Sequence, residues 1–391
     1  MAHSKRCKGT KRIGIAIEMD QPYPHHLGCH EGILRYAAMK EDWHVVVDPY
    51  LMGILNGSGV REYDGIVGRI SRKAAEQARA AGIPVVNHWI NSSACDTPSV
   101  LPDCRRGSEM AAEHLLARGF HHFGYVGSIR DRARRFHLSG FEPLIHERGF
   151  GIEKFDAPLR CEANSTAFVR FYGRLREWLA GLTKPVALLV SLEVIGLYVV
   201  QVCSELGLRI PHDLGIMVCR ENPTICLQTT PTLSCIEDDN ERIGYRAAQV
   251  LDQIMLGETE ASSDPIWIEP KGLRVRGSSD AFVSKAPIVS RAMRFMTEHS
   301  NQAITVNHVA QAANTSKGTL QQRFARDVGR SVYSEICRLR AERVKRILID
   351  SDATLEQIAI DNGFTDLSHL VKSFRKATGV TPGEFRKRHR H

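Results

Sequence analysis

The last quarter of the chain repeats itself, and this repeat constrains the fold more than any other feature. Five residues recur at offsets of 49 to 50 positions: Thr305, Ala310, Leu320, Phe324 and Gly329 return as Thr354, Ala359, Leu370, Phe374 and Gly379. In each copy the Leu and the Phe lie four residues apart, which is the spacing of one helix face. The repeat therefore predicts two similar units, each a short helix, a turn and a second helix.

The boundaries of these helices carry capping signals. Thr354 to Gln357 and Thr381 to Glu384 have the capping-box pattern, and Pro382 occupies a first helical position. Between the two units, Cys337, Ala341, Val344 and Leu348 continue the helical period. We expect an all-α domain over residues 288–391 with a long central helix joining its halves.

The excess positive charge lies in the same region. Residues 287–391 contain 18 Lys and Arg against 10 Asp and Glu, whereas the whole chain has 52 against 44, so the remainder is balanced. A neutral body with a basic end is suited to binding a phosphate backbone. A merely solvated basic tail is the alternative, but it would not need this helical pattern.

The two second helices carry polar side chains that can read DNA. Two such helices about 34 Å apart would enter adjacent major grooves of one duplex. Side chains suited to base edges are Gln321, Gln322, Ser368, His369 and Lys372. Side chains suited to phosphates are Arg323, Arg326 and Arg375. A purely structural helical bundle would share the core periodicity but would not require these residues.

The second unit resembles the AraC/XylS family of transcription regulators. The similar stretches are Ile358-Ala359, residues 362–366 (NGFTD), residues 374–376 (FRK) and residues 379–386 (GVTPGEFR). The resemblance implies a regulator whose partners are double-stranded DNA and RNA polymerase. Gly318 departs from the pattern, because several relatives carry a large DNA-contacting side chain there, so the first recognition helix is expected to read fewer bases.

Residues 11–271 alternate short β-branched runs with helical stretches. Strands are expected at 12–18, 45–48, 65–67, 84–87, 123–127, 186–190 and 215–218, and helices at 27–39, 72–81, 107–118, 136–147, 194–206 and 243–256. This alternation predicts an α/β domain with its ligand at the carboxyl ends of parallel strands. We assign residues 11–275 to this domain and residues 276–287 to a linker, because small and breaker residues replace the periodicity there.

The α/β domain is similar to the periplasmic-binding-protein type of sensor in LacI/GalR regulators. The similar stretches are residues 31–37 (EGILRYA), 63–67 (YDGIV), 82–86 (GIPVV), 111–120 (AAEHLLARGF) and 243–248 (IGYRAA). The resemblance implies two lobes that close over a sugar, a homodimer, and ligand-binding roles for Asp103, Arg135 and Glu193. Carboxylates accept hydroxyl hydrogen bonds, and a guanidinium donates them in pairs. Solvated charges at loop ends are the alternative for each residue.

Arg220 departs from that family. Cys219-Arg220-Glu221-Asn222 follows a predicted strand where relatives place a carboxylate. A donor-only cation should reject the same hydroxyl arrangement and favour an acidic ligand, such as a uronate or a sugar phosphate. A pocket that no longer binds a ligand, in a regulator that acts constitutively, is the other reading.

Rival functions lack their motifs. His25, His26, Cys29 and His30 could hold a metal if helical, but zinc usually needs three or four converging ligands, so we read them as a partly exposed rim of the cleft. Neither a phosphate-binding Gly-rich loop nor a nucleophile elbow is found, so we expect no enzyme activity and no cofactor. A solute-binding protein or an enzyme with a helical interaction module remains the alternative.

The expected location is the cytoplasm. The chain has no run of eighteen apolar residues and no signal-peptide pattern, so no membrane partner is expected. Its ten cysteines form no C-x-x-C pair, which indicates reduced thiols. Together these features predict a DNA-binding transcription regulator of carbohydrate-utilisation genes, controlled by a small sugar or sugar-derived ligand.

Overall fold

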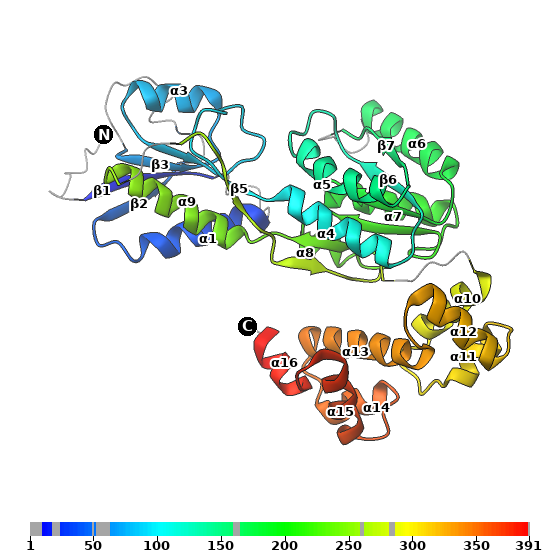
Figure 1. Cartoon of the computed structure of the whole chain (residues 1–391). Helices are drawn as coiled ribbons and strands as arrows, with labels where there is room; N and C mark the ends of the chain where they lie inside the picture. Colours follow the sequence, from blue (N-terminus) through cyan, green and yellow to red (C-terminus); the bar gives the residue numbers. More distant parts are fainter. Residues whose placement is uncertain are drawn as a thin grey trace. The chain divides into compact units, whose positions relative to one another are not determined.

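The computed structural model describes residues 10–17, 24–48, 51, 63–158, 165–258, 262–280 and 286–389. The chain divides into two compact units (Figure 1). Unit 1 runs to Asp280, and unit 2 comprises Ala281–His391 together with the short segment Ala117–Phe120. No helix in these described ranges is long and apolar enough to cross a membrane.

Unit 1 has two lobes, each built on its own sheet. The first lobe has four parallel strands in the order β2-β1-β3-β4. They are β1 Lys11–Ala16, β2 Trp43–Val47, β3 Gly65–Gly68 and β4 Val85–Asn87, with helices α1 Pro24–Ala37, α3 Arg72–Ala80 and α9 Asn240–Met255. Strands β3 and β4 are buried along their whole length, as is typical of parallel sheets whose two faces are covered.

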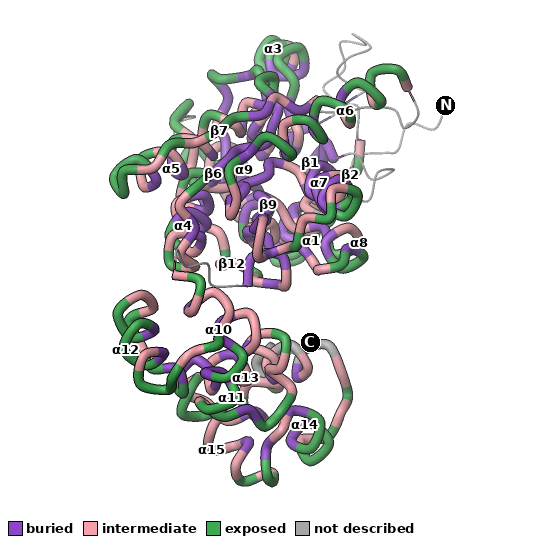
Figure 2. Tube along the Cα trace, turned by 90° about the vertical axis from the view of Figure 1, so that its right-hand side faces the viewer, coloured by how far each residue is buried: buried purple, intermediate pink, exposed green. Residues whose placement is uncertain are grey.

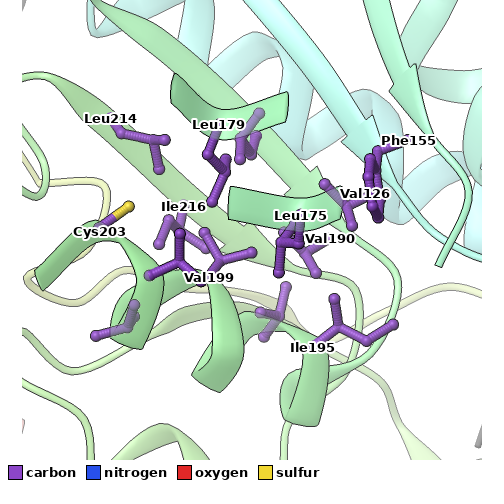
Figure 3. Packing of buried hydrophobic residues seen from close by; sticks show 14 of the residues in the cluster. Val126, Phe155, Leu175, Leu179, Val190, Ile195, Val199, Cys203, Leu214 and Ile216 are labelled. Atoms are coloured by element: carbon purple, nitrogen blue, oxygen red, sulfur yellow. The ribbon is translucent and has the colours of Figure 1, made fainter. Parts of the chain in front are cut away.

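The second lobe has a six-stranded sheet in the order β12-β10-β9-β8-β6-β7. Its strands are β6 His122–Val126, β7 Ile152–Phe155, β8 Val186–Val190, β9 Leu214–Val218, β10 Ser234–Glu237 and the antiparallel β12 Gly272–Arg274. Its helices are α4 Cys104–Ala117, α5 Ala133–Glu147, α6 Thr166–Gly181, α7 Glu193–Glu205 and α8 Pro223–Cys226. Leu175, Leu179 and Val199 pack from α6 and α7 onto Val190 and Ile216 of the sheet (Figure 3).

The chain passes between the lobes three times. β5 (Val100–Pro102) leads from the first lobe into α4, β10 leads back into α9, and β11 (Ile266–Ile268), paired with β5, leads on to β12 (Figure 1). The returning α9 lies directly against α1. Glycines allow this close approach: a side chain at Gly32 would collide with the backbone of Glu241, and one at Gly244 with the backbone of Cys29.

The predicted fold class, a two-lobed α/β domain followed by an all-α domain, is confirmed. The linker predicted for residues 276–287 differs from the structure at its start. Ser278 and Ser279 are fully buried, and the backbone N–H of Ile216 donates to the Ser278 carbonyl at 2.8 Å. These small residues resemble a loop in composition, but in the fold they fill the tight space beside β9 and β10. Residues 281–285, also assigned to the linker, lie outside the described residues.

Unit 2 is helical and shows the repeat directly. Its helices are α10 Pro287–Glu298, α11 Val306–Ala312, α12 Lys317–Val328, α13 Val332–Asp350, α14 Leu355–Asp361, α15 Leu367–Thr378 and α16 Pro382–His389. Leu320 and Phe324 of α12 are buried in one small core, and Leu370 and Phe374 of α15 are buried in another. The two cores are equivalent halves of the domain.

The repeated threonines and glycines mark the ends of these helices. Thr305 and Thr354 cap α11 and α14 through their side chains. Gly329 and Gly379 end α12 and α15 in the left-handed conformation, at φ +76 and +81. Glycine adopts this conformation without the steric cost that a side chain brings, which explains why both positions are glycine.

Polar contacts join the two halves of unit 2 to the central helix. Glu335 at the start of α13 is fully buried and forms ion pairs with Arg330 and Arg338. Further along α13, the Arg343 Nε donates to the Asn362 side-chain oxygen at 2.8 Å. Asn362 lies in the turn between α14 and α15, so α13 holds both helix pairs.

Candidate functional site

The second helix of each pair presents a polar face to solvent. In α12, Gln321, Gln322, Arg323 and Arg326 are all exposed, while the face with Leu320 and Phe324 is buried (Figure 2). The α12 helix begins at Lys317, and the space beside Gly318 is open. The predicted side chains are therefore accessible, and Gly318 leaves a gap among them.

The α15 helix has the same division. Ser368, Lys372 and Arg375 are exposed, whereas His369 is partly buried. The His369 ring lies edge-on to Phe364 at 5.4 Å between centroids, and its Nδ1 is 3.1 Å from the Thr365 hydroxyl. These contacts fix the ring at the first turn of the helix.

A cavity of about 1150 Å³ in unit 1 draws its walls from both lobes. Its polar residues follow the carboxyl ends of strands, as expected for an α/β fold. Arg69 follows β3 and His88 follows β4 in the first lobe. Glu193 follows β8 and Arg220 follows β9 in the second lobe. Ligands in such folds bind where strand ends converge, so this cavity is the candidate sensor site.

Two of the four predicted ligand residues line this cavity and two do not. Glu193 and Arg220 are in its wall. Asp103 instead accepts a hydrogen bond from the Arg106 backbone at 2.9 Å, in the first turn of α4. Arg135 lies on the exposed face of α5, outside the wall. The structure thus corrects the assignments of Asp103 and Arg135.

Several wall residues were not assigned to the site from the sequence. They are Arg69, His88, Trp89, Asp131 and Asp238. The Arg69 guanidinium lies over the Trp89 ring at 4.7 Å from its centroid. A polar residue directly after a buried strand was the available signal, since Arg69, His88 and Asp238 each lie one residue past a strand end.

The histidines of α1 belong to the same wall. His25 and His26 stack edge to face with 4.1 Å between centroids, and the Arg69 Nη1 lies 3.3 Å from the His26 Nε2. His26 is buried rather than exposed at a rim. Burial, together with the nearby positive charge of Arg220, lowers the pKa of His25 to about 2. Burial also lowers the pKa of His88 to about 4, so both imidazoles are neutral near pH 7.

A metal site at these histidines is not supported. In the ranges that the structure describes, no group of three or more His, Cys, Asp or Glu side chains could hold a metal ion. His26 is instead engaged with Arg69.

The acidic residues of the cavity surround Arg220. Burial lowers the pKa of the Arg220 guanidinium, but the negative charges of nearby groups, among them Asp131 and Asp238, outweigh this effect and raise it. Burial raises the pKa of Asp238 to about 6, against the lowering influence of Arg220. The Glu193 Oε2 is buried without a hydrogen-bond partner among the described residues. The wall therefore offers both cationic donors and anionic acceptors.

Comparison with known proteins identifies both parts of the chain. Residues 309–388 match the model of a helix-turn-helix domain, and residues 112–279 match that of a periplasmic binding protein-like domain. The chain is 22% identical over 386 residues to the xylose operon regulatory protein of Escherichia coli K12, covering 96% of this chain and 97% of that protein.

Two further similarities have different extents. A putative AraC-like transcription regulator of Streptomyces antibioticus is 34% identical over 101 residues, which are 26% of this chain and 33% of that protein. The solved structure of the xylose-binding transcription activator xylR superposes with a TM-score of 0.67 at 21% identity, over 98% of this chain and 100% of that one. The chain therefore carries a periplasmic binding protein-like domain followed by an AraC-type helix-turn-helix domain, and it is similar over nearly its whole length to transcription regulators of this arrangement.

Proposed function

We propose that this protein regulates carbohydrate-utilisation genes in the cytoplasm by binding DNA through α12 and α15, under control of a small sugar or sugar derivative bound in the cavity of unit 1. One observation carries the proposal. Each of two matched helices buries an equivalent Leu-Phe pair and exposes polar and basic side chains, in the same chain as a polar cavity. The names of the full-length relatives, which concern xylose, support a sugar as the ligand.

The proposed DNA contacts divide by chemistry. Gln321 and Gln322 on α12, and Ser368, His369 and Lys372 on α15, contact base edges. Arg323, Arg326 and Arg375 contact phosphates, which position the protein without specifying sequence. The exposure of these side chains and the fixed ring of His369 support this division.

The test is a gel shift of the full-length protein on the upstream region of its own gene and on random DNA, with and without sugars. Lys372→Ala should cost about 1 to 3 kcal/mol on the specific site, since a base contact is lost, and little on random DNA. Arg326→Ala should weaken both DNAs about equally. Lys73→Ala, an exposed lysine of α3 in unit 1, is the control and should change neither.

If Lys372→Ala lowers the affinity for both DNAs equally, Lys372 contacts phosphates and not a base edge. No binding to either DNA would refute the regulatory function.

We also propose that the full chain is a homodimer through unit 1 and that unit 2 recruits RNA polymerase. A two-fold pair would let a ligand-driven change in unit 1 alter the distance between two DNA-binding ends. Sedimentation at micromolar concentration tests the first point, and a monomer with and without DNA contradicts it.

A further inference from the structure

The Arg220 guanidinium is a cation held in the cavity wall without a direct partner. Among the described residues it makes no hydrogen bond and no salt bridge, although it lies near several acidic groups. Several arginines near the cavity are paired, and the wall arginines Arg130, Arg170 and Arg174 are exposed. Arg276 pairs with Glu221, Arg274 with Glu221 and Glu237, and Arg134 with Asp156. Arg220 differs from them because it is half-buried and its five N–H donors have no partner among the described residues.

The wall beside Arg220 in the first lobe supplies more donors and little negative charge. His25 lies close enough to Arg220 and Arg69, and His88 close enough to Arg69, for these cations to disfavour a further positive charge on each ring. The His88 Nε2 is buried and has no hydrogen-bond partner among the described residues. A buried polar atom without a partner costs free energy that a ligand can recover.

The opposite wall offers acceptors for hydroxyl groups. Glu193 exposes only 8% of its surface, and its Oε2 has no partner among the described residues. Asp238 directly follows β10, a strand of the second-lobe sheet, and its charge acts on Arg220. Carboxylate oxygens accept hydrogen bonds from ligand hydroxyls. The wall of the second lobe therefore has hydroxyl acceptors near Arg220.

We propose that the ligand is a polyhydroxylated anion, with its carboxylate or phosphate against Arg220 and His88 and its hydroxyls against Glu193 and Asp238. This inference rests on the proposed function, since it names the ligand class of the same cavity. A neutral sugar would satisfy the hydrogen bonds of Arg220 but would leave its charge without a direct counter-ion. Sugar acids and sugar phosphates share the required chemistry.

Calorimetric titration of the full-length protein tests the ligand class. The probes form matched sets: xylose, xylonate and xylose 5-phosphate; glucose, glucuronate and glucose 6-phosphate; and inorganic phosphate alone. At least one anionic sugar should bind with a Kd about tenfold or more below that of its neutral parent, because charge-assisted hydrogen bonds are the stronger ones. Preference for the acids or for the phosphates then identifies the anionic group.

Variants test whether Arg220 makes the contact. Arg220→Gln should raise the Kd of the preferred anion by about tenfold or more and leave that of its neutral parent nearly unchanged. Arg220→Lys should recover part of the affinity, because the charge returns without the planar guanidinium. Arg135→Gln is the matched control, since this arginine of α5 is exposed and outside the cavity wall. Thermal unfolding of each variant verifies its fold.

The inference is overturned if a neutral parent binds as tightly as its anionic derivatives, or if no anionic probe binds at millimolar concentration. If Arg220→Gln does not fold, the affinities of the wild type for neutral and anionic sugars still show whether the ligand is an anion. A gel shift run on the same samples separates the two proposals. If a neutral sugar binds more tightly than the anions and alters DNA binding, the anionic ligand is refuted and the regulatory function is retained. If an anionic sugar binds but the protein binds no DNA, the regulatory function is refuted and the anionic ligand is retained.

Discussion

In unit 1 the polar residues of the cavity come from loops far apart in the sequence, whereas in unit 2 the exposed polar residues lie along single helices. Arg69 and Arg220 share a wall although 151 positions separate them in the chain. By contrast, Gln321 to Arg326 lie within α12, and Ser368 to Arg375 lie within α15. The cavity depends on how two lobes are assembled, while each recognition surface depends on one helix and its caps.

The largest effect is expected where the assembly of unit 1 is tightest. Gly244→Ala should lower the free energy of unfolding of unit 1 by more than about 3 kcal/mol, because the new methyl group would collide with the backbone of Cys29. All four tryptophans lie in unit 1, so denaturation followed by tryptophan fluorescence reports on this unit alone.

The matched control is Gly173→Ala in α6, where the same methyl group meets no atom within 4 Å. It should raise stability by up to about 1 kcal/mol through helix propensity. Similar destabilisation by both changes would contradict the role of the α1–α9 contact.

A substitution of a buried carboxylate in unit 2 should destabilise unit 2 and leave unit 1 unchanged. Glu335→Ala removes the partner of Arg330 and Arg338, and leaving those cations uncompensated should cost about 3 kcal/mol of stability. Loss of helical circular dichroism should then occur at lower denaturant, while the tryptophan transition of unit 1 stays in place. Glu342→Ala, on the same helix, removes the partner of Lys345 at a more accessible position and should cost under about 1 kcal/mol. A shift of the tryptophan transition by Glu335→Ala would show that the two units unfold together.

A smaller difference is expected in the response to pH. His88 and His137 are buried in unit 1 with pKa values lowered to about 4, whereas His299, His308 and His369 of unit 2 are all partly or fully exposed. As the pH falls below 6.5, the unfolded chain takes up protons that folded unit 1 does not, so unit 1 loses stability. Asp238, with a pKa raised to about 6, opposes part of this loss because it binds its proton in the folded state first.

The net loss for unit 1 should be about 1 to 2 kcal/mol between pH 6.5 and 5.5. Urea denaturation followed by tryptophan fluorescence at several pH values measures it. His88→Gln should flatten the slope, and His369→Gln in unit 2 should leave it unchanged. A pH-independent midpoint in the wild type would rule out the neutral buried histidines.

These contrasts explain what could be predicted from the sequence. The positions of α12 and α15 follow from local signals, namely the Leu-Phe spacing and the capping residues at each end. The apolar runs of unit 1 also predict β1 to β4, β6, β8 and β9, but they do not predict the short strands β5, β7, β10, β11 and β12. Local signals do not predict which polar residues face the cavity, because the direction of each side chain depends on its position in the turn of the helix or loop that carries it.

Asp103 directly follows β5 and Arg135 lies within α5, and neither lines the cavity. Asp103 hydrogen-bonds into the first turn of α4, and Arg135 points away on the outer face of α5. Asp131, four residues before Arg135, lines the cavity instead. Glu193 and Arg220 do line the cavity, and each follows a fully buried strand of the six-stranded sheet within three residues.

The burial of residues 276–280 determines how a signal can leave unit 1. Ser278 is hydrogen-bonded to Ile216 of β9, and Arg276 donates to the Leu233 carbonyl, so this covalent tether to unit 2 is anchored on the second lobe. If ligand closes the cavity, the first lobe moves while the anchored end of the tether does not. Relative to the attachment point of unit 2, the second lobe would then stay in place and the first lobe would move. A ligand can change DNA binding only by as much as its affinity differs between the open and closed arrangements, so a substitution that locks the first lobe should act like the ligand itself.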